Sequence, residues 1–146
     1  MRFWDSSALL PLMVEEGRSA ACRALRRADR VTVVWALTRV ELVSATRRLV
    51  RESLLDAADV AVALRRLDAL ASAWTEIEAL TIVRERAERL FGAHALTAAD
   101  ALQLGAALIQ VRDRPKGRAF VTADDRLGRA AEAEGFDVIV PADRPR

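Results

Sequence analysis

Short apolar runs alternate with helix-forming stretches along this chain, and that alternation limits the possible folds more than any other feature. Strands that are joined through helices pair in parallel, and parallel sheets are buried on both faces. The sequence therefore predicts an α/β fold with a central, mainly parallel sheet. The expected strands are residues 2–4, 31–34, 74–77, 119–122 and 138–140, and the expected helices are residues 8–14, 18–28, 37–51, 57–72, 80–90, 97–111 and 126–134.

The composition is that of one folded domain. Of the 146 residues, 52% are hydrophobic and 30% are charged, which is typical of globular and not of disordered chains. No apolar run approaches the roughly 20 residues of a membrane span, and the start shows no signal-peptide pattern. The single cysteine, Cys22, excludes an internal disulfide framework and a cysteine-rich zinc site. We expect a cytoplasmic protein without a membrane segment, with one domain over residues 1–142 and a tail over 143–146.

The net charge of +2 hides an uneven distribution. Residues 18–66 hold eleven arginines and five acidic residues, so this segment carries +6 and leaves −4 for the remainder. A basic half beside an acidic half favours a protein that contacts phosphates with one part and holds cations with the other. An ordinary solvated helix surface is the alternative for any single arginine. The candidate phosphate contacts are the pairs Arg26-Arg27, Arg47-Arg48 and Arg65-Arg66.

A carboxylate stands where the first expected strand gives way to a helix. Asp5 directly follows the apolar pair Phe3-Trp4, and the short polar side chains at positions 5–7 favour a helix N-cap. Ligands bind at the carboxyl ends of parallel strands. Asp5 is therefore the first candidate for a functional site at this edge of the sheet.

Two further acids lie in the first turns of expected helices. Glu41 and Asp100 each come three residues after a threonine, a spacing that is also typical of a capping box, and capping is the alternative role for both. The helix that Asp100 opens is apolar almost all round. A carboxylate on an apolar face requires a cation or a hydrogen-bond donor, which favours a functional role. The helical neighbours of Glu41 are small or apolar, namely Leu37, Ser44 and Ala45.

Two acids follow the expected strand at residues 119–122. One of Asp124 and Asp125 is expected to cap the next helix. Asp124 comes first and lies nearer the mouth of the sheet edge, so it is the candidate for the site. The charge of Asp125 favours the positive end of the helix dipole.

These acids all fall at strand ends or in first helical turns, and a parallel sheet would bring them to one edge. Crowded carboxylates repel one another unless a divalent cation neutralises them. Because the donors are oxygens only, they favour Mg²⁺ or Mn²⁺ over zinc. The predicted metal ligands are Asp5, Glu41, Asp100 and Asp124.

Four segments carry a resemblance to a known family. They are residues 3–9 (FWDSSAL), 38–42 (TRVEL), 94–107 (HALTAADALQLGAA) and 120–124 (FVTAD). In order and spacing they resemble the PIN domains, specifically the VapC-type toxin ribonucleases of bacterial toxin–antitoxin pairs. The match covers nearly the whole chain, and its third segment is the most specific.

The resemblance implies a single PIN-like domain with three α/β/α layers and metal-dependent endoribonuclease activity. It also implies homodimers and inhibition by a small cognate antitoxin. Ser6 and Thr122 match the family's hydroxyl residues. They are expected to orient the carboxylates through hydrogen bonds, without binding the metal themselves. The family's basic residue before the third acid is replaced by Leu96-Thr97, so no substrate contact is assigned there. The family's catalytic acids correspond to Asp5, Glu41, Asp100 and Asp124.

The expected mechanism is hydrolysis of an RNA phosphodiester by two-metal chemistry, with ions roughly 3.5–4 Å apart. Asp5 and Asp100 are expected to be direct or bridging ligands, and Glu41 and Asp124 to complete the ligand set. No histidine base is needed, and His94 is expected to flank a helix or lie in a loop. The remaining unusual residues, Cys22, Trp4, Trp35 and Trp74, are expected to serve packing or dimer contacts.

Three alternatives compete with this function. An aspartate-nucleophile phosphotransferase would place a second acid two residues after Asp5, where Ser7 stands. A response-regulator receiver would need a lysine after a late strand, but Lys116, the only lysine, precedes its strand. A non-catalytic PIN-fold module that binds RNA or protein is the strongest competitor, and it predicts loss of the acids, all of which are present.

Overall fold

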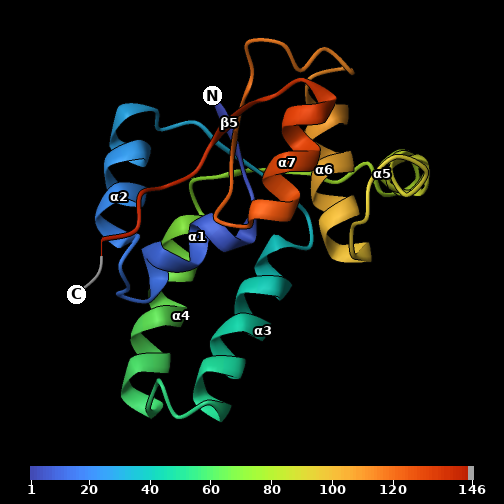
Figure 1. Ribbon diagram of the computed structural model, residues 1–146. Helices are drawn as coiled ribbons and strands as arrows, with labels where there is room; N and C mark the ends of the chain where they lie inside the picture. Colours follow the sequence, from blue (N-terminus) through green and yellow to red (C-terminus); the bar gives the residue numbers. More distant parts are fainter. Residues whose placement is uncertain (145–146) are drawn as a thin grey trace.

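The structure is a computed structural model that describes residues 1–144, and these form a five-stranded sheet with helices on both faces (Figure 1). The predicted order of elements is confirmed, with boundaries that differ by one or two residues. Within residues 1–144 the strands are β1 (Arg2–Trp4), β2 (Thr32–Trp35), β3 (Thr75–Ile77), β4 (Ala119–Val121) and β5 (Asp137–Ile139). The helices are α1 (Ser6–Met13), α2 (Ser19–Ala28), α3 (Thr38–Arg51), α4 (Ala57–Ala71), α5 (Leu80–Leu90), α6 (Ala98–Gln110) and α7 (Asp125–Glu134).

Six strand boundaries differ from the sequence prediction by one residue, and three of them concern Val31, Val140 and Thr122. β2 begins after Val31 and β5 ends before Val140. These two valines are about half exposed, with 50% and 48% of their surface accessible to solvent. β-Branched residues fit strands, but the sheet takes in only the residues that its neighbours cover. β4 ends at Val121, so Thr122 lies in the loop that follows the strand.

The sheet is parallel throughout, with strand order β3-β2-β1-β4-β5. The chain moves outward from β1 to β3 and then returns to place β4 on the other side of β1. The order therefore reverses between β1 and β4, which is where a crevice for ligands forms in such sheets. Trp4 pairs with Val121 at the carboxyl ends of these two strands. Asp5 and Thr122, the next residue in each chain segment, consequently lie side by side.

Alternate residues of the central strands serve two hydrophobic cores, as the two-sided burial of a parallel sheet requires. One core packs against α5, α6 and α7 and the other against α1 to α4, which confirms the three-layer fold. The rings of Phe3 and Phe120 stack in the first core with their centroids 5.4 Å apart. Trp4 and Cys22 are buried in the second core and Trp35 in the first, so all three serve packing.

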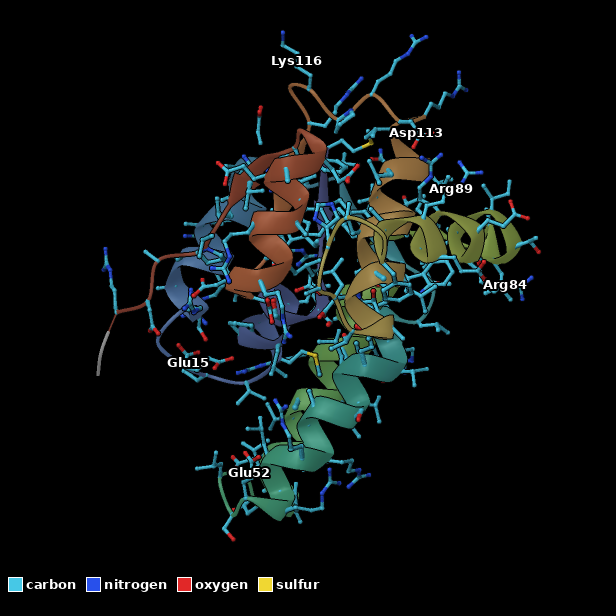
Figure 2. The ribbon with its side chains drawn as sticks, turned by 45° about the vertical axis from the view of Figure 1, so that its right-hand side comes forward. Glu15, Glu52, Arg84, Arg89, Asp113 and Lys116 are labelled. Carbon is cyan, nitrogen blue, oxygen red and sulfur yellow. The ribbon has the colours of Figure 1, made fainter. Side chains whose placement is uncertain are left out.

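Helices α3 and α4 extend together beyond the carboxyl edge of the sheet (Figure 1). Glu52 marks the tip of this arm, and Lys116 lies at the opposite end of the molecule (Figure 2). The arm turns back at Asp56, the N-cap of α4, which forms a capping box with Asp59. The base of the arm, where α3 begins, lies over the carboxyl edge of the sheet.

The described part of the predicted tail contacts the loop between α1 and α2. The backbone N–H of Arg144 donates to the carbonyl of Gly17 at 3.2 Å, and Arg18 lies 3.8 Å from the carboxylate of Asp143. Residues 145–146 of that tail lie outside the described residues. Among the helices of residues 1–144, none has the length and apolar character needed to cross a membrane.

Two helical glycines give a matched test of the packing. A Cβ on Gly105 would lie 3.1 Å from the carbonyl oxygen of Val83 in α5, whereas a Cβ on Gly128 would meet only side chains, at 3.5 Å or more. Alanine is favoured over glycine inside a helix by roughly 0.5–1 kcal/mol where space allows. We predict that Gly128→Ala raises the free energy of unfolding by about that amount, and that Gly105→Ala lowers it because the α5 backbone must move. Equal gains for both variants in urea unfolding would contradict this.

Candidate carboxylate site

Asp5 is the most deeply buried acid of the described chain, with 3% of its surface exposed. Its backbone N–H donates to the carbonyl of Val121, which continues the pairing of β1 with β4 by one residue. The carboxylate caps α1 by accepting from the backbone N–H of Ser7 at 3.2 Å. The sequence prediction of a carboxylate between strand and helix is therefore confirmed.

Three hydroxyl groups surround the Asp5 carboxylate. Thr122 donates to Oδ2 at 3.0 Å, Ser7 donates to the same oxygen, and Ser6 lies 3.3 Å from Oδ1. Thr122 and Ser6 therefore contact the carboxylate that they were expected to orient. Ser7 was not predicted for this role, although a hydroxyl two residues after an N-capping aspartate is well placed to reach back to it.

The loop after β4 is bonded to the same group of hydroxyls. Ala123 N–H donates to Ser7 Oγ at 2.9 Å, and Asp124 N–H donates to Thr122 Oγ1 at 3.0 Å. The segments after β1 and after β4 are thus joined by side-chain bonds that all lead to Asp5. This network fixes the position of the carboxylate between the two strands.

Glu41 is held by α6 and not by its own helix. Its Oε2 accepts from the side-chain amide of Gln103 at 2.7 Å, and the same amide nitrogen lies 3.2 Å from Thr38 Oγ1. The N-cap of α3 is Leu37, without a side-chain bond, so a capping box is not the role of Glu41. The small and apolar neighbours of Glu41 do not form a buried face, because Leu37 and Ser44 are exposed to solvent.

Gln103 is the site residue that the sequence analysis missed. It is 1% exposed and lies one helical turn after Asp100 in an otherwise apolar helix. A polar amide in such a helix must find partners, which is the signal that could have identified it. Glu41 and Thr38 are those partners.

Asp100 lies in the first turn of α6, half-buried, where Thr97 caps the helix by accepting from the Asp100 backbone N–H at 3.2 Å. The cap therefore uses the threonine side chain, and no hydrogen bond or ion pair within residues 1–144 engages the Asp100 carboxylate. Its charge raises the pKa of both Asp5 and Glu41. Three predicted acids, from β1, α3 and α6, are thus brought together.

Burial dominates the electrostatics of the two inner acids. It raises the pKa of Asp5 above its ordinary value of 3.8, against hydrogen bonds from Ser7 and Thr122 that lower it. Burial also raises the pKa of Glu41 above 4.5, against hydrogen bonds from Ser6 and Gln103. Since the Ser6 hydroxyl reaches both acids, it lies between them. A neighbouring cation would relieve the cost of ionising both groups.

Asp124 lies at the margin of this group. It is the N-cap of α7, and its Oδ1 accepts from the Leu127 backbone N–H at 2.8 Å, which occupies one of its two carboxylate oxygens. Burial is the main cause of the raised pKa of Asp5 and of Glu41, and the charge of Asp100 adds to both. Asp125 is exposed in the first turn of α7. The structure therefore links Asp124 to the site through Thr122 and leaves Asp125 outside it.

Two hollows lie beside α3 close to the acids, and Arg48 lines both. The first, here the α3 hollow, includes Glu41 and Arg51. The second, here the Ser6 hollow, has a volume of about 360 Å³ and includes Ser6, Arg18 and Asp124. Cationic side chains thus lie beside the acids, where they can meet the phosphates of a ligand.

The chemistry of the donor set fits Mg²⁺ or Mn²⁺, because Asp5, Glu41 and Asp100 offer carboxylate oxygens at one edge and the inner two are costly to ionise alone. Their present side-chain positions do not form a closed ligand set. Among residues 1–144, no three acidic, histidine or cysteine side chains lie close enough together to hold one ion. Glu41 and Asp5 are instead bonded to Gln103 and to hydroxyls, from which they would turn to bind a cation.

Comparisons with known proteins support the fold. No protein-family model matches this chain, and no curated protein matches it either. Among solved structures, PAE2754 from Pyrobaculum aerophilum is 23% identical, with a TM-score of 0.59 over 95% of this chain and 87% of that chain. FitAB bound to an IR36 DNA fragment is 16% identical, with a TM-score of 0.59 over 100% and 99%. These likenesses establish a PIN-like fold, as the sequence motifs predicted.

The raised pKa values predict how the stability of the metal-free protein depends on pH. A carboxyl with a raised pKa binds its proton more tightly in the folded state, so its contribution to stability is full below the ordinary values of 3.8 and 4.5 and is lost as the pH rises through the folded-state values. Asp5→Asn keeps an N-capping side chain and has no proton to lose. In chelator, its free energy of unfolding should exceed that of the unchanged protein near neutral pH, and the difference should shrink toward about pH 4.

The exposed Asp125→Asn variant is the control, and its difference from the unchanged protein should not grow with pH in this way. Urea unfolding at a series of pH values measures both. A difference for Asp5→Asn that is largest in acid would contradict the assigned direction.

Proposed function

We propose that this protein is a metal-dependent endoribonuclease that acts as the toxin of a toxin–antitoxin pair. The observation that carries the proposal is the meeting of Asp5, Glu41 and Asp100, which come from sequence-distant elements, at the carboxyl edge beside the reversal of strand order. The sequence motifs and the PIN-like fold support the same family of activities. The ribonuclease activity and its metal dependence are our inference from these features together.

Each residue of the site has a defined part in this proposal. Asp5, Glu41 and Asp100 would hold Mg²⁺ or Mn²⁺, with Asp124 completing the set through its free carboxylate oxygen. The chemistry that a bound ion supplies there is activation of water and stabilisation of negative charge on the phosphodiester. The chain itself orients the acids.

The orienting residues divide between the two inner acids. Thr122 and Ser7 hold Oδ2 of Asp5, and Gln103 holds Glu41. Ser6 lies between the two carboxylates and can donate to either one. These residues act by positioning, since they hold the carboxylates and not the substrate.

Arg48 is the best-placed residue to bind the substrate backbone. It lines both hollows, with Glu41 beside it in one and Asp124 in the other. Its only ion pair within the described chain is with Glu52 at 3.9 Å, and both side chains are largely exposed. Such a loose surface pair contributes little and leaves the guanidinium free to bind phosphate.

The proposed partners are an RNA substrate, a cognate antitoxin protein and a second copy of this chain. The FitAB structure was determined with bound DNA, so DNA is the nucleic acid to compare with RNA. A non-catalytic PIN-fold module that binds RNA or protein is the second candidate. It is favoured by the lack of a closed ligand set among the acids of residues 1–144.

The deciding experiment incubates purified protein with structured RNA, and separately with DNA, in the presence of Mg²⁺ or Mn²⁺ and in chelator. We expect metal-dependent RNA cleavage, and its loss in Asp5→Asn and Asp100→Asn, both of which should fold. A metal at about 100 times its dissociation constant should also raise the free energy of unfolding by roughly 2.7 kcal/mol. RNA binding without cleavage, together with no effect of metal on the melt, would favour the non-catalytic module.

Asp124 and Asp125 give a sharper test of the site. Asn at position 124 can still cap α7, so Asp124→Asn removes the charge while keeping the helix end. We predict that it reduces cleavage strongly and blunts the metal-induced rise in melting temperature. Asp125→Asn should keep cleavage within a few-fold of the unchanged protein and cost about 0.3–1 kcal/mol, because it removes a charge from the positive end of α7. An essential Asp125 and a dispensable Asp124 would overturn the assignment.

Arg48 and its neighbour Arg47 test the substrate path. Arg47 is exposed and lines neither of the two hollows. We predict that Arg48→Gln weakens single-stranded RNA binding and reduces the log–log slope of affinity against salt by about 0.7, the contribution of one phosphate contact. Arg47→Gln should change neither. Binding titrations of catalytically inactive Asp100→Asn protein over a salt series measure both slopes, and equal effects would place the RNA elsewhere.

A further inference from the structure

A further hollow of the described chain lies away from the acids. It has a volume of about 430 Å³, within the range of small-ligand sites. Arg30 and Ala73, two of its lining residues, precede β2 and β3, which places the hollow near the amino edge of the sheet. The acids lie at the carboxyl edge. This arginine hollow is lined by Leu12, Arg23, Arg26, Arg27, Arg30 and Ala73.

Three of its arginines have no partner in the part of the chain that the structure describes. The side chains of Arg26, Arg27 and Arg30 make no hydrogen bond or ion pair with any other residue of 1–144. Nε of Arg26 is fully covered and finds no acceptor in the described chain. A buried guanidinium N–H without an acceptor is costly, and the charge of Arg26 has no counter-ion among the described residues to offset that cost.

The acids nearest to these arginines in sequence are paired with other groups. Asp29 bonds the amino terminus and lies 3.9 Å from Arg2. Glu15, at the α1–α2 loop (Figure 2), bonds both terminal nitrogens of Arg23 at 2.8 and 3.0 Å. The hollow therefore keeps the positive charge of three guanidinium groups.

The arginine hollow is separate from the proposed path of RNA. Arg18 continues the row of arginines toward the Ser6 hollow, but it is bonded to the carbonyl of Pro141 at 2.8 Å and paired with Asp143. Glu15 and Glu16 lie in the loop that precedes α2, and Glu16 lines the Ser6 hollow. The engagement of Arg18 therefore interrupts the row of free arginines between the two hollows.

We propose that the arginine hollow binds a nucleoside diphosphate or triphosphate. Guanidinium groups match phosphate oxygens in geometry and charge, and a chain of two or three phosphates can engage Arg26, Arg27 and Arg30 together. Leu12 and Ala73 supply apolar surface for the sugar and base. The site goes beyond the proposed nuclease function and does not depend on it.

The test measures equilibrium binding to the full chain in chelator, so that no metal and no cleavage contribute. The probes are ADP, GDP, inorganic pyrophosphate, a single-stranded RNA without terminal phosphates, and a glutamate-rich peptide. The double variant Arg27→Gln/Arg30→Gln alters only exposed side chains. The matched control is Arg84→Gln/Arg89→Gln, two exposed arginines on α5 (Figure 2).

We expect ADP or GDP to bind saturably and more tightly than pyrophosphate. The Arg27→Gln/Arg30→Gln variant should weaken that binding by at least about tenfold, the effect of losing charge-assisted bonds. The α5 variant and Asp5→Asn should bind as the unchanged protein does, and that result keeps this site distinct from the nuclease site. Absence of nucleotide binding, equal binding by both double variants, or arginine-dependent binding of only the RNA or the peptide would overturn the proposal.

Discussion

Burial of the Asp5 carboxylate between β1 and β4 is the constraint on which the rest of the site depends. A nearly inaccessible carboxylate is tolerated only when donors or cations surround it. The chain supplies Ser7 and Thr122 from the two segments that follow these strands. Because those hydroxyls are in turn bonded to the backbone of Ala123 and Asp124, the loop after β4 takes its shape from the same carboxylate. The same hydrogen bonds therefore stabilise the loop after β4 and position the Asp5 carboxylate.

Much of this arrangement could be predicted because it is local. The strand-to-helix change at Asp5, the capping of α4 by Asp56 and the burial of α6 each follow from a few consecutive residues. The bond between Glu41 and Gln103 could not be predicted in the same way, since it joins residues 62 positions apart. Local spacing left a capping box as the alternative role for Glu41, and the structure rules that alternative out. Long-range partners of polar side chains depend on how helices pack, and sequence periodicity does not contain that information.

The two edges of the sheet have opposite electrostatic character. At the carboxyl edge, burial and the charge of Asp100 raise the pKa of both Asp5 and Glu41. Near the amino edge, Arg26, Arg27 and Arg30 pair with no acid of residues 1–144. The uneven charge along the sequence thus corresponds to acidic side chains at one edge of the sheet and basic side chains near the other. An overall charge of +2 gives no hint of these two fields, and each of them favours a ligand of the opposite sign.

The double engagement of Asp124 has a consequence for how such a chain can evolve. Its carboxylate caps α7 while its backbone N–H bonds Thr122, so position 124 is constrained by folding even without any catalytic demand. Among common substitutions, Asn, Ser and Thr would preserve the cap, whereas Ala would fray the helix beside Thr122. A homologue that lost the proposed activity could therefore carry Asn, Ser or Thr at position 124 and keep the same fold. The residue at position 124 would then distinguish a homologue that lost the proposed activity from one in which α7 is also destabilised.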